Sequence, residues 1–593
     1  MTLEQATIFA ILAAALGLFV WGRLRYDAVA VMALLAAVLT GLVSAEEAFT
    51  GFGHPAVVTV AAVLILSHAL RKSAVTELAV RLLQPFSGNP TLHIMVLTGL
   101  AAVCSAFMNN VGALALLLPV AIMSANASGR PVSRLLMPLS FASLLGGLIT
   151  LIGTPPNIII ASFREQATGA SFAMFDFAPV GLGVAAAGLV FIALVGWRLL
   201  PKERAAEASA AVDFHIEDYL TQVRLPDDSA FVGRRLIELE NLAEGDLASL
   251  ALVRRGDRML APSGYLRLQA GDVIEVEADA ATLKRVVEDA ALELVGASAH
   301  GAEAFSSDRV ELIEAVVTPR SRMEGLTARH LRLHTAFGLN LLGVARQGQA
   351  LTGRLGAVRF QAGDVLLLQG ESVGIPAALT TLGCLPLAQR ELPPQRPTVA
   401  SMRAPVVFGV AILFAVLGIL PLQISFVSAV VALVLLREIN LQELYEGVDW
   451  AIIVLLGAMI PVGAALESTG GTMLIAEPII RLSETVPVWG LLALLMVLTM
   501  LLSDVINNAA TAVLMAPIGI TIAEGLGVSI DPFLMAVAVG SSSTFLTPIG
   551  HQSNLLVMGP GGYRFGDYWR LGLPLDFLIV AVAVPLILLA WPL

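Results

Sequence analysis

The sequence is poor in charged residues and in cysteine, and each shortage excludes a class of protein. Charged residues make up 14% of the 593 residues, and acidic residues outnumber basic ones by 46 to 35, for a formal net charge of -11. Because no basic stripe is available to neutralise phosphates, nucleic acid is not expected as a partner. The two cysteines provide neither a disulfide framework nor a metal-ligand spacing.

The sequence motifs of common enzymes are missing as well. There is no phosphate-binding Gly-Lys-Ser/Thr loop, no G-x-G-x-x-G after a strand-like run, and no histidine beside Cys104. We therefore expect that the protein is not an enzyme and that ATP hydrolysis does not drive it.

Apolar sequence is abundant, at 57% of all residues. Apolar runs of membrane-spanning length occur in both halves of the chain. Of the 35 Lys and Arg residues, 22 fall within 202–403, between those halves. This distribution predicts a polytopic α-helical protein of the cell (inner) membrane, embedded in the lipid bilayer and carrying a soluble insert. The apolar stretch 8–20 lacks the flanks of a signal peptide and is expected to be a retained first helix.

A short polar motif interrupts an apolar run in each half of the chain. It is a serine followed by two adjacent asparagines, and its members recur at a spacing of 398 residues: Ser105, Asn109 and Asn110, then Ser503, Asn507 and Asn508. Paired amides within hydrocarbon are costly unless something uses their dipoles. Matched interruptions in two half-chains therefore indicate the binding site of a transporter.

The repeat predicts two membrane halves, 1–202 and 401–593, each with five transmembrane helices and one re-entrant hairpin. Because this number of crossings is odd, the second half would be inverted relative to the first. Basic residues in short loops then place the insert in the cytoplasm and both termini outside. Within the insert, Leu268–Val273 matches Phe360–Val365 at a spacing of 92 residues. We therefore expect two α+β modules, 203–300 and 301–400.

A hairpin that turns within the membrane exposes N–H groups that suit an anion and carbonyl groups that suit Na+. Serine hydroxyls and asparagine amides supply further ligands for both. The interrupted segments contain no Lys or Arg, so bound cations would have to balance an anionic substrate. Other uses of these residues remain open, because the asparagines could join helices and the serines could bond to their own helix.

The two hairpins, together with Gly153-Thr-Pro-Pro-Asn157 and Thr547-Pro-Ile-Gly550, resemble the divalent anion:sodium symporters of the ion transporter superfamily. The insert resembles two C-terminal domains of the regulator-of-K+-conductance type (TrkA-C or RCK-C), as in the sulfate-transporter branch of that family. The resemblance implies a homodimer that moves its substrate by an elevator motion, with Na+ as the coupling ion. It also implies regulation at the RCK-C-like modules, with a nucleotide as one possible regulator.

The resemblance further implies the ligands of each site. One sodium site would be formed by Ser105, Asn109, Asn110 and Gly153, and the other by Ser503, Ile506 (through its carbonyl), Asn508 and Gly550. Substrate contacts are expected from Asn110, Val111, Asn157, Asn508, Ala509, His551, Ser553 and Asn554. Dicarboxylate carriers of the family have threonine where this chain has Val111 and Ala509. The missing hydroxyls favour a smaller anion.

We therefore expect sodium-coupled import of a divalent inorganic anion, with sulfate as the best candidate. A dicarboxylate:sodium symporter is the alternative within transport. A cation/proton antiporter is an alternative of another class, for which Asp504 would be essential, since exchangers place ionisable residues at the midplane. A further alternative is an anion sensor that signals through the insert without net transport.

Overall fold

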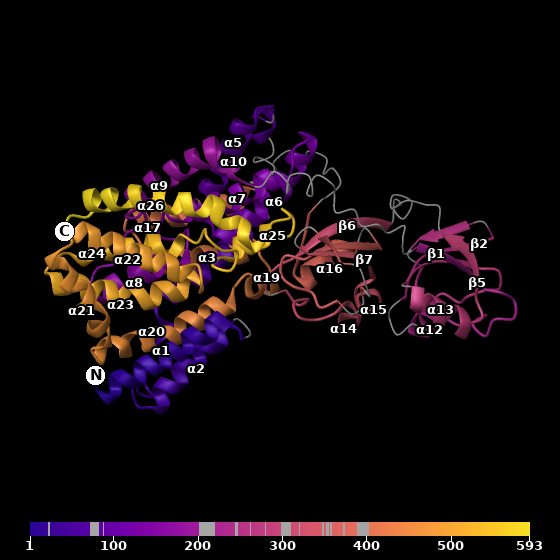
Figure 1. The fold of residues 1–593 in the computed structure, drawn as a ribbon, viewed down its shortest axis with the longest axis horizontal. Coiled ribbons are helices and arrows are strands. Elements are labelled where there is room, and N and C mark those ends of the chain that lie inside the picture. Colours follow the sequence, from indigo (N-terminus) through magenta and orange to yellow (C-terminus); the bar gives the residue numbers. More distant parts are fainter. Residues whose placement is uncertain are drawn as a thin grey trace.

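The chain forms a large helical body with two small β-sheets beside it (Figure 1). The structure, a computed structural model, describes residues 1–21, 24–71, 82–86, 88–200, 220–242, 247–255, 257–260, 262–278, 280–297, 310–319, 321–346, 349–351, 355, 358–371, 374–387 and 402–593. The expected domain boundaries at 202, 300 and 400 lie outside the described residues.

The helical body is built from two sets of helices. The first set is α1 (Leu3–Trp21), α2 (Tyr26–Leu39), α3 (Pro55–Arg71), α5 (Pro90–Phe107), α6 (Asn110–Ala127), α7 (Ser133–Gly147), α8 (Pro155–Thr168), α9 (Ala178–Phe191) and α10 (Trp197–Leu199). The second set is α17 (Arg403–Val416), α18 (Leu422–Leu435), α19 (Leu441–Glu446), α20 (Trp450–Ser468), α21 (Gly471–Arg481), α22 (Val488–Ser503), α23 (Asn508–Leu526), α24 (Ile530–Ser542), α25 (Gln552–Met558) and α26 (Tyr568–Ala590).

The helical body is a membrane domain by length and composition. Within the described residues, five helical stretches are long and apolar enough to cross a membrane: Pro90–Phe107, Ala178–Leu199, Trp450–Ser468, Asn508–Leu526 and Phe565–Ala590. Other apolar helices of the body have 10–17 residues. Helix α2, for example, ends at Leu39 because the chain turns at Gly41, whose φ is +80°.

The two halves of the body exchange packing partners. Helix α2 packs against α20 and α18 packs against α3, while α9 runs along α26. Within the halves, α5 packs on α7 and α22 packs on α24. A methyl group on Gly146 would overlap the backbone of Ala102, and one on Gly540 would press on the carbonyl of Met496. Small residues thus let these helices approach closely, as is usual in membranes.

The insert contains two five-stranded antiparallel sheets of the same strand order. The first sheet runs β3-β2-β4-β1-β5 and the second β8-β7-β9-β6-β10. The strands are β1 (Leu220–Arg224), β2 (Leu247–Arg254), β3 (Asp257–Leu260), β4 (Val273–Ala278), β5 (Glu293–Ala297), β6 (Val310–Val317), β7 (Leu339–Arg346), β8 (Gln349–Ala350), β9 (Val365–Glu371) and β10 (Cys384–Pro386). The helices are α12 (Leu236–Leu242), α13 (Ala280–Asp289), α14 (Ala328–Leu331), α15 (Leu333–Phe337) and α16 (Ile375–Leu382).

The repeated Gly-Asp motif of the insert has the same structural role in both sheets. Asp272 forms an ion pair with Arg254 (2.7 Å), and Asp364 forms one with Arg346 (2.8 Å). These hydrogen bonds to a carboxylate raise the pKa of both arginines. The polar groups of the motif therefore fasten the strand that follows it and are not free to bind a ligand.

The second sheet packs against the helical body, and its Gly363 turn takes part in this contact. The equivalent turn of the first sheet, at Gly271, does not contact the body in the part of the chain that the structure describes. Val316, Ala345 and Val365 belong to the same continuous apolar cluster as the membrane helices. A methyl group on Gly559, just after α25, would overlap the carbonyl of Gly363. The equivalent glycine of the first sheet, Gly271, would have nothing within 4 Å of an added methyl group. The duplicated turn is thus buried in one copy and open in the other.

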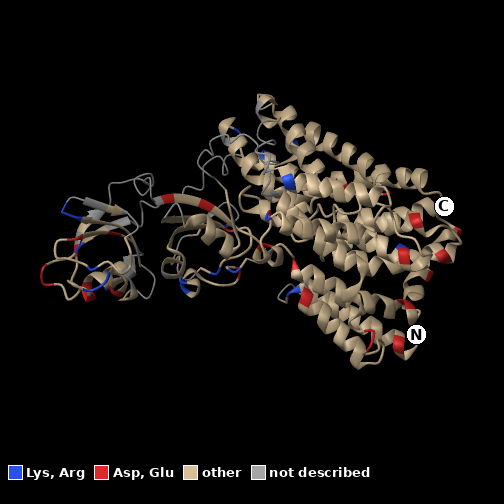
Figure 2. Ribbon diagram, turned by 180° about the vertical axis from the view of Figure 1, so that it is seen from behind, with Lys and Arg blue, Asp and Glu red and all other residues tan. Residues whose placement is uncertain are grey.

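Charge is distributed unevenly over the helical body. Most of its Lys and Arg lie at the end that faces the sheets, and most of its Asp and Glu lie at the opposite end (Figure 2). Both chain termini are also found at that opposite, acidic end (Figures 1 and 2).

Candidate functional site

The break between α5 and α6 is built from two asparagines with different roles. Oδ1 of Asn109 accepts a hydrogen bond from Gly112 N at 2.9 Å, so this side chain caps the start of α6. Asn110, the first residue of α6, is 2% exposed, and its side chain lies 2.8 Å from the hydroxyl of Ser105. The second asparagine therefore faces the interior of the body.

The break between α22 and α23 follows the same plan. Oδ1 of Asn507 accepts from Ala509 N at 2.9 Å and caps α23. Oδ1 of Asn508 accepts from the same N–H at 2.8 Å. The Nδ2 group of Asn508 is buried and has no hydrogen-bond partner among the described residues. One amide donor is therefore available for a ligand at this break.

The side-chain amide of Asn110 is surrounded by oxygen atoms. One end of the amide lies 2.8 Å from Ser105 Oγ, 3.0 Å from Ser143 O and 3.2 Å from Gly153 O. With its nitrogen at this end, the amide donates to all three oxygens. With its oxygen there, four oxygens converge. A methyl group on Gly147 would overlap this amide, so the approach requires glycine.

His551 connects the two halves at this point. Its Nδ1 accepts a hydrogen bond from Ser553 N at 3.0 Å, so the neutral ring carries its proton on Nε2. Nε2 lies 3.5 Å from the amide of Asn110. When the Asn110 nitrogen points inward, the amide oxygen faces this N–H. The structure thus brings His551 to the first-half hairpin, a contact that the sequence did not reveal.

Around the second break, Gly550 lies against the backbone of α22. A Cβ atom on Gly550 would be 2.9 Å from the carbonyl oxygen of Ser503 and 3.0 Å from Cα of Asp504. The hydroxyl of Ser503 donates to Ser541 O at 2.6 Å, and Ile506 is buried close by in the break. Ser503 and Gly550 are therefore neighbours, as their assignment to one sodium site requires.

Two matched asparagines support the loops that complete the site. Nδ2 of Asn157 donates to Gly147 O (3.3 Å) and Thr150 O (2.9 Å). Nδ2 of Asn554 donates to the carbonyls of the equivalent residues, Thr544 (2.7 Å) and Thr547 (3.2 Å). Oδ1 of Asn554 also accepts from Ser140 Oγ at 2.8 Å. Asn554 is therefore fully engaged within the protein, which gives it a bracing role.

Several buried polar atoms on the two helix breaks and on the loops beside them have no partner among the described residues. In the described part of the chain they include Thr154 Oγ1, Asn157 Oδ1, Asp504 Oδ2, Asn508 Nδ2, Ser542 Oγ, Thr544 Oγ1 and Ser553 Oγ. Each such atom costs free energy unless a ligand satisfies it. Hydroxyl and amide groups suit both Na+ and an oxyanion, so this donor set fits the coupling ion that the sequence implied.

The structure divides the expected substrate contacts into two groups. The side chains of Asn110 and His551 lie 3.5 Å apart, and Asn508 Nδ2 and Ser553 Oγ are buried without a partner among the described residues. Val111 offers no polar side-chain atom, and the N–H of Ala509 is already bonded by both asparagines of its break. Sequence reasoning missed Ser542 and Thr544, although the run Ser541-Ser-Ser-Thr544 within an apolar segment is a visible signal.

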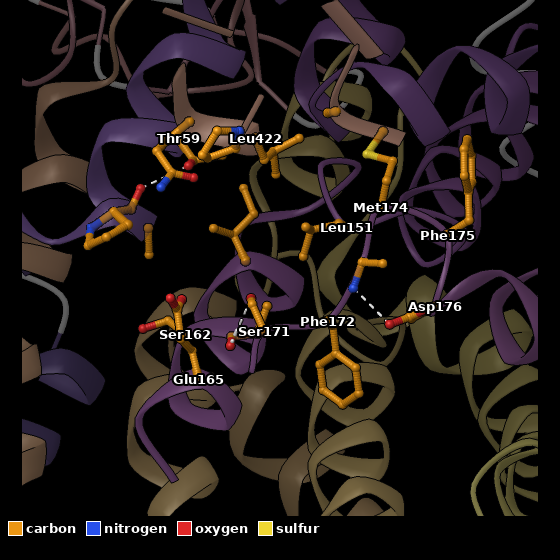
Figure 3. A pocket seen from close by; sticks show the side chains of 18 of the residues that line it. Thr59, Leu151, Ser162, Glu165, Ser171, Phe172, Met174, Phe175, Asp176 and Leu422 are labelled. Carbon is orange, nitrogen blue, oxygen red and sulfur yellow. Dashed lines mark hydrogen bonds between the residues drawn. The ribbon is translucent and has the colours of Figure 1, made fainter. Parts of the chain in front are cut away.

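A cavity of about 520 Å³ is lined by residues from both halves of the helical body. It is bounded by α3, α8, the loop before α9 and the α17–α18 connection, and Figure 3 shows Thr59, Leu151, Ser162 and Glu165 on its walls. Its charged lining residues, Glu165 and Asp176, are both acidic. Carboxylates repel an anion, so this cavity does not fit the anion site.

Comparison with known proteins places these features in a family. The family model described as citrate transporter matches residues 16–540 and 479–593. The chain is 32% identical over 588 residues to an uncharacterized transporter of Synechocystis, sll0640, covering 98% of this chain and 96% of that protein. It is 29% identical to a putative sulfur deprivation response regulator of Chlamydomonas reinhardtii, over 93% of this chain and 96% of that protein. It is also 28% identical to sodium/sulfate cotransporter 1 of the same alga, over 57% of this chain and 40% of that protein.

Proposed function

Because the chain belongs to the citrate transporter family, we propose that it is a sodium-coupled secondary active symporter that imports a divalent inorganic anion, sulfate. The similarity to a protein named sodium/sulfate cotransporter supports both the ion and the anion. Membrane helices, a polar site between two broken helix pairs, and the family itself all describe a transporter rather than an enzyme.

The proposed sodium site rests mainly on the oxygen atoms that surround the side-chain amide of Asn110. With Oδ1 directed inward, this oxygen meets Ser105 Oγ, Ser143 O and Gly153 O. Ser105 Oγ, Ser143 O and Gly153 O thus surround one position close to this amide, and these three oxygens could serve a cation. Amide, hydroxyl and carbonyl oxygens are the ligands that hard cations prefer.

Neutral donors would hold the anion. Asn508 Nδ2, Ser553 Oγ and His551 Nε2–H are the groups that the structure leaves for it. Oriented neutral dipoles can bind an oxyanion without a counter-charge from the protein. The bound sodium ions then supply the compensating positive charge, which makes anion binding dependent on sodium.

The overall mechanism is proposed from the arrangement of the two halves. The reciprocal packing of α2 on α20 and of α18 on α3 supports an inverted repeat, since a two-fold relation between halves produces such an exchange. We further propose a homodimer with an elevator motion, from the family resemblance. The basic end of the body faces the sheets (Figure 2), which supports a cytoplasmic insert and extracytoplasmic termini.

The insert is proposed to regulate transport as a pair of RCK-C-like modules. Its docking beside α25 connects the second module to the segment that carries His551. A nucleotide regulator would have to bind away from the Gly-Asp turns, because Asp272 and Asp364 are both paired with arginine.

Uptake of labelled sulfate into proteoliposomes tests the proposal. We expect accumulation that requires an inward sodium gradient and that is competed by thiosulfate but not by succinate. Ser105→Ala should remove most sodium-dependent uptake. Ser128→Ala is the matched control, because that hydroxyl bonds only to carbonyls of its own helix in the described structure. Absence of uptake by folded protein, with or without sodium, would exclude sulfate symport.

A sensor is the second candidate, since a relative that spans nearly the whole chain is named as a sulfur deprivation response regulator. Sodium-dependent sulfate binding to the purified protein without uptake into proteoliposomes would favour this candidate over the symporter.

A further inference from the structure

Three carboxylates lie buried in the second half of the helical body, and Asp567 accepts a hydrogen bond from Arg564 N, whereas the other two each keep an oxygen without a partner among the described residues. Asp504 caps the end of α22 and is 3% exposed, and Asp576, in the third turn of α26, is 8% exposed. One oxygen of each, Oδ2 of Asp504 and Oδ1 of Asp576, has no hydrogen-bond partner in the residues that the structure describes. Ionisable residues at such depth are costly and are typically functional.

The loop that follows α24 connects the surroundings of Asp504 with helix α26. Oδ1 of Asp504 accepts a hydrogen bond from Leu546 N at 3.1 Å. The preceding residue, Phe545, has its carbonyl against Gly572, one turn before Asp576 on α26. Asp504 and the α26 turn that precedes Asp576 therefore contact the same short segment, Phe545–Leu546.

A third polar group independently indicates a ligand at this place. The side chain of Thr544 is fully buried, and its hydroxyl has no partner among the described residues. Thr544 and the backbone of Asp504 both lie against Gly550, within 3.1 Å of the position of an added Cβ. A hydroxyl and two carboxylate oxygens are thus left unsatisfied in one region.

No basic residue of the neighbouring helices balances this negative charge. Helices α9, α22 and α24, which pack against α26, contain no Lys or Arg. Arg570 of α26 is exposed, and Arg198 of α10 stacks on Trp197. Two further acidic residues lie on the elements next to α26: Asp531 of α24, which is bonded to Arg164, and Asp567 of the turn Phe565–Asp567, which accepts a hydrogen bond from Arg564 N.

We propose that Asp504 and Asp576, with the hydroxyl of Thr544, form a binding site for an additional sodium ion. This inference rests on the proposed sodium-coupled transport and deepens it. Two sodium ions at the broken helices would balance a divalent anion and leave the two carboxylates unbalanced. A further Na+ between them offsets their mutual repulsion and satisfies the free oxygens. The site would therefore add one cation to each transport cycle.

The number of bound sodium ions tests this proposal without requiring transport. Equilibrium binding of radioactive sodium to the purified full-length protein, in detergent and without anion, should give one fewer ion per chain for Asp576→Asn than for the unchanged protein. Glu524→Gln, an exposed carboxylate of α23, is the matched control and should bind the full number. Thr544→Val should weaken the binding of one sodium ion, and it serves where Asp576→Asn does not fold.

An unchanged sodium count in folded Asp576→Asn and Thr544→Val would overturn the proposal. A second result would also overturn it. If Asp576→Asn binds the full number of sodium ions but loses sulfate uptake driven by a pH gradient, Asp504 and Asp576 bind a proton and not a sodium ion. If the count falls as expected while no anion is transported, the additional sodium site stands and the proposed symport function fails.

Discussion

Asn157 and Asn554, 397 residues apart in the sequence, make the same pair of side-chain hydrogen bonds. Each donates from Nδ2 to two carbonyls that lie ten and seven residues before it. The donors fix the loops that carry Gly153 and Gly550. The equivalence of the two halves is thus maintained by specific bonds at the site, beyond the similarity of the sequence.

Replacing either asparagine should loosen its loop. For Asn554→Ala, two carbonyls and Ser140 Oγ lose their partner, so we expect a destabilisation of at least about 3 kcal/mol, because each buried group left unsatisfied costs ~1–3 kcal/mol. Thermal unfolding in detergent measures this effect. Ser128→Ala is the control, and equal melting temperatures for the two variants would contradict the bracing role.

An alanine at Gly147 should abolish the first sodium site. Its methyl group would overlap the Asn110 amide and push it away from Ser105, Ser143 and Gly153. We expect sodium-dependent sulfate uptake to fall by at least about tenfold, equivalent to ~1.4 kcal/mol of lost binding. Gly99→Ala, on α5, is the control, because nothing lies within 4 Å of its added methyl group. Normal uptake by Gly147→Ala would exclude a sodium ion at Asn110.

The two ring nitrogens of His551 can be tested separately. Asparagine can replace Nδ1 as the acceptor for Ser553 N, but it lacks a donor at the Nε2 position. Glutamine places an amide nearer the Nε2 position and loses the cap. We expect His551→Asn to keep the melting temperature and raise the KM for sulfate, whereas His551→Gln lowers the melting temperature. An unchanged KM in His551→Asn would remove this residue from the anion site.

The second module should become less stable as the pH rises. Burial raises the pKa of Glu314, in β6, above 4.5, so the folded module holds a proton that the unfolded chain releases more readily. The contribution of Glu314 to the stability of the module is therefore complete below about pH 4.5, and it is lost as the pH rises through the folded-state pKa of this carboxyl group. Glu314→Gln should weaken this pH dependence of module unfolding, followed by calorimetry of the full chain. Glu238→Gln, in the first module, should not change it.

Displacing the docked turn should separate the second module from the helical body. A methyl group at Gly559 would overlap the Gly363 carbonyl, so Gly559→Ala should increase amide exchange in the turn 361–364 and in α25. Gly566→Ala is a nearby control, with nothing within 4 Å of its methyl group. Unchanged exchange in Gly559→Ala would show that the docking contact contributes nothing to protection.

The sequence could predict the helix breaks, because adjacent asparagines within apolar runs have few structural explanations. It could not separate the two members of each pair. Asn109 and Asn507 cap helices, while Asn110 and Asn508 face the interior. A shift of the helix start by one residue would exchange these two roles. Sequence-based helix boundaries are not that accurate.

The contacts between segments far apart in the chain could not be predicted from the sequence for a different reason. The approach of His551 to Asn110 joins residues 441 positions apart, and neither residue type requires the other. Asp576 was visible as a lone carboxylate in the last apolar run, but its relation to Asp504 depends on how α26 packs. The Gly363–Gly559 contact leaves no side-chain pattern at all, because both partners are glycine.

The duplicated turn of the insert has consequences for engineering the protein. Gly363 is constrained by its positive φ of +88° and by its contact with the helical body. Gly271 also has a positive φ, of +83°, but it has no such contact. A fluorescent protein or affinity label joined to the first module's turn therefore leaves the second module's contact with the helices intact. The open copy is the place to attach a reporter when the working carrier must be followed in living cells.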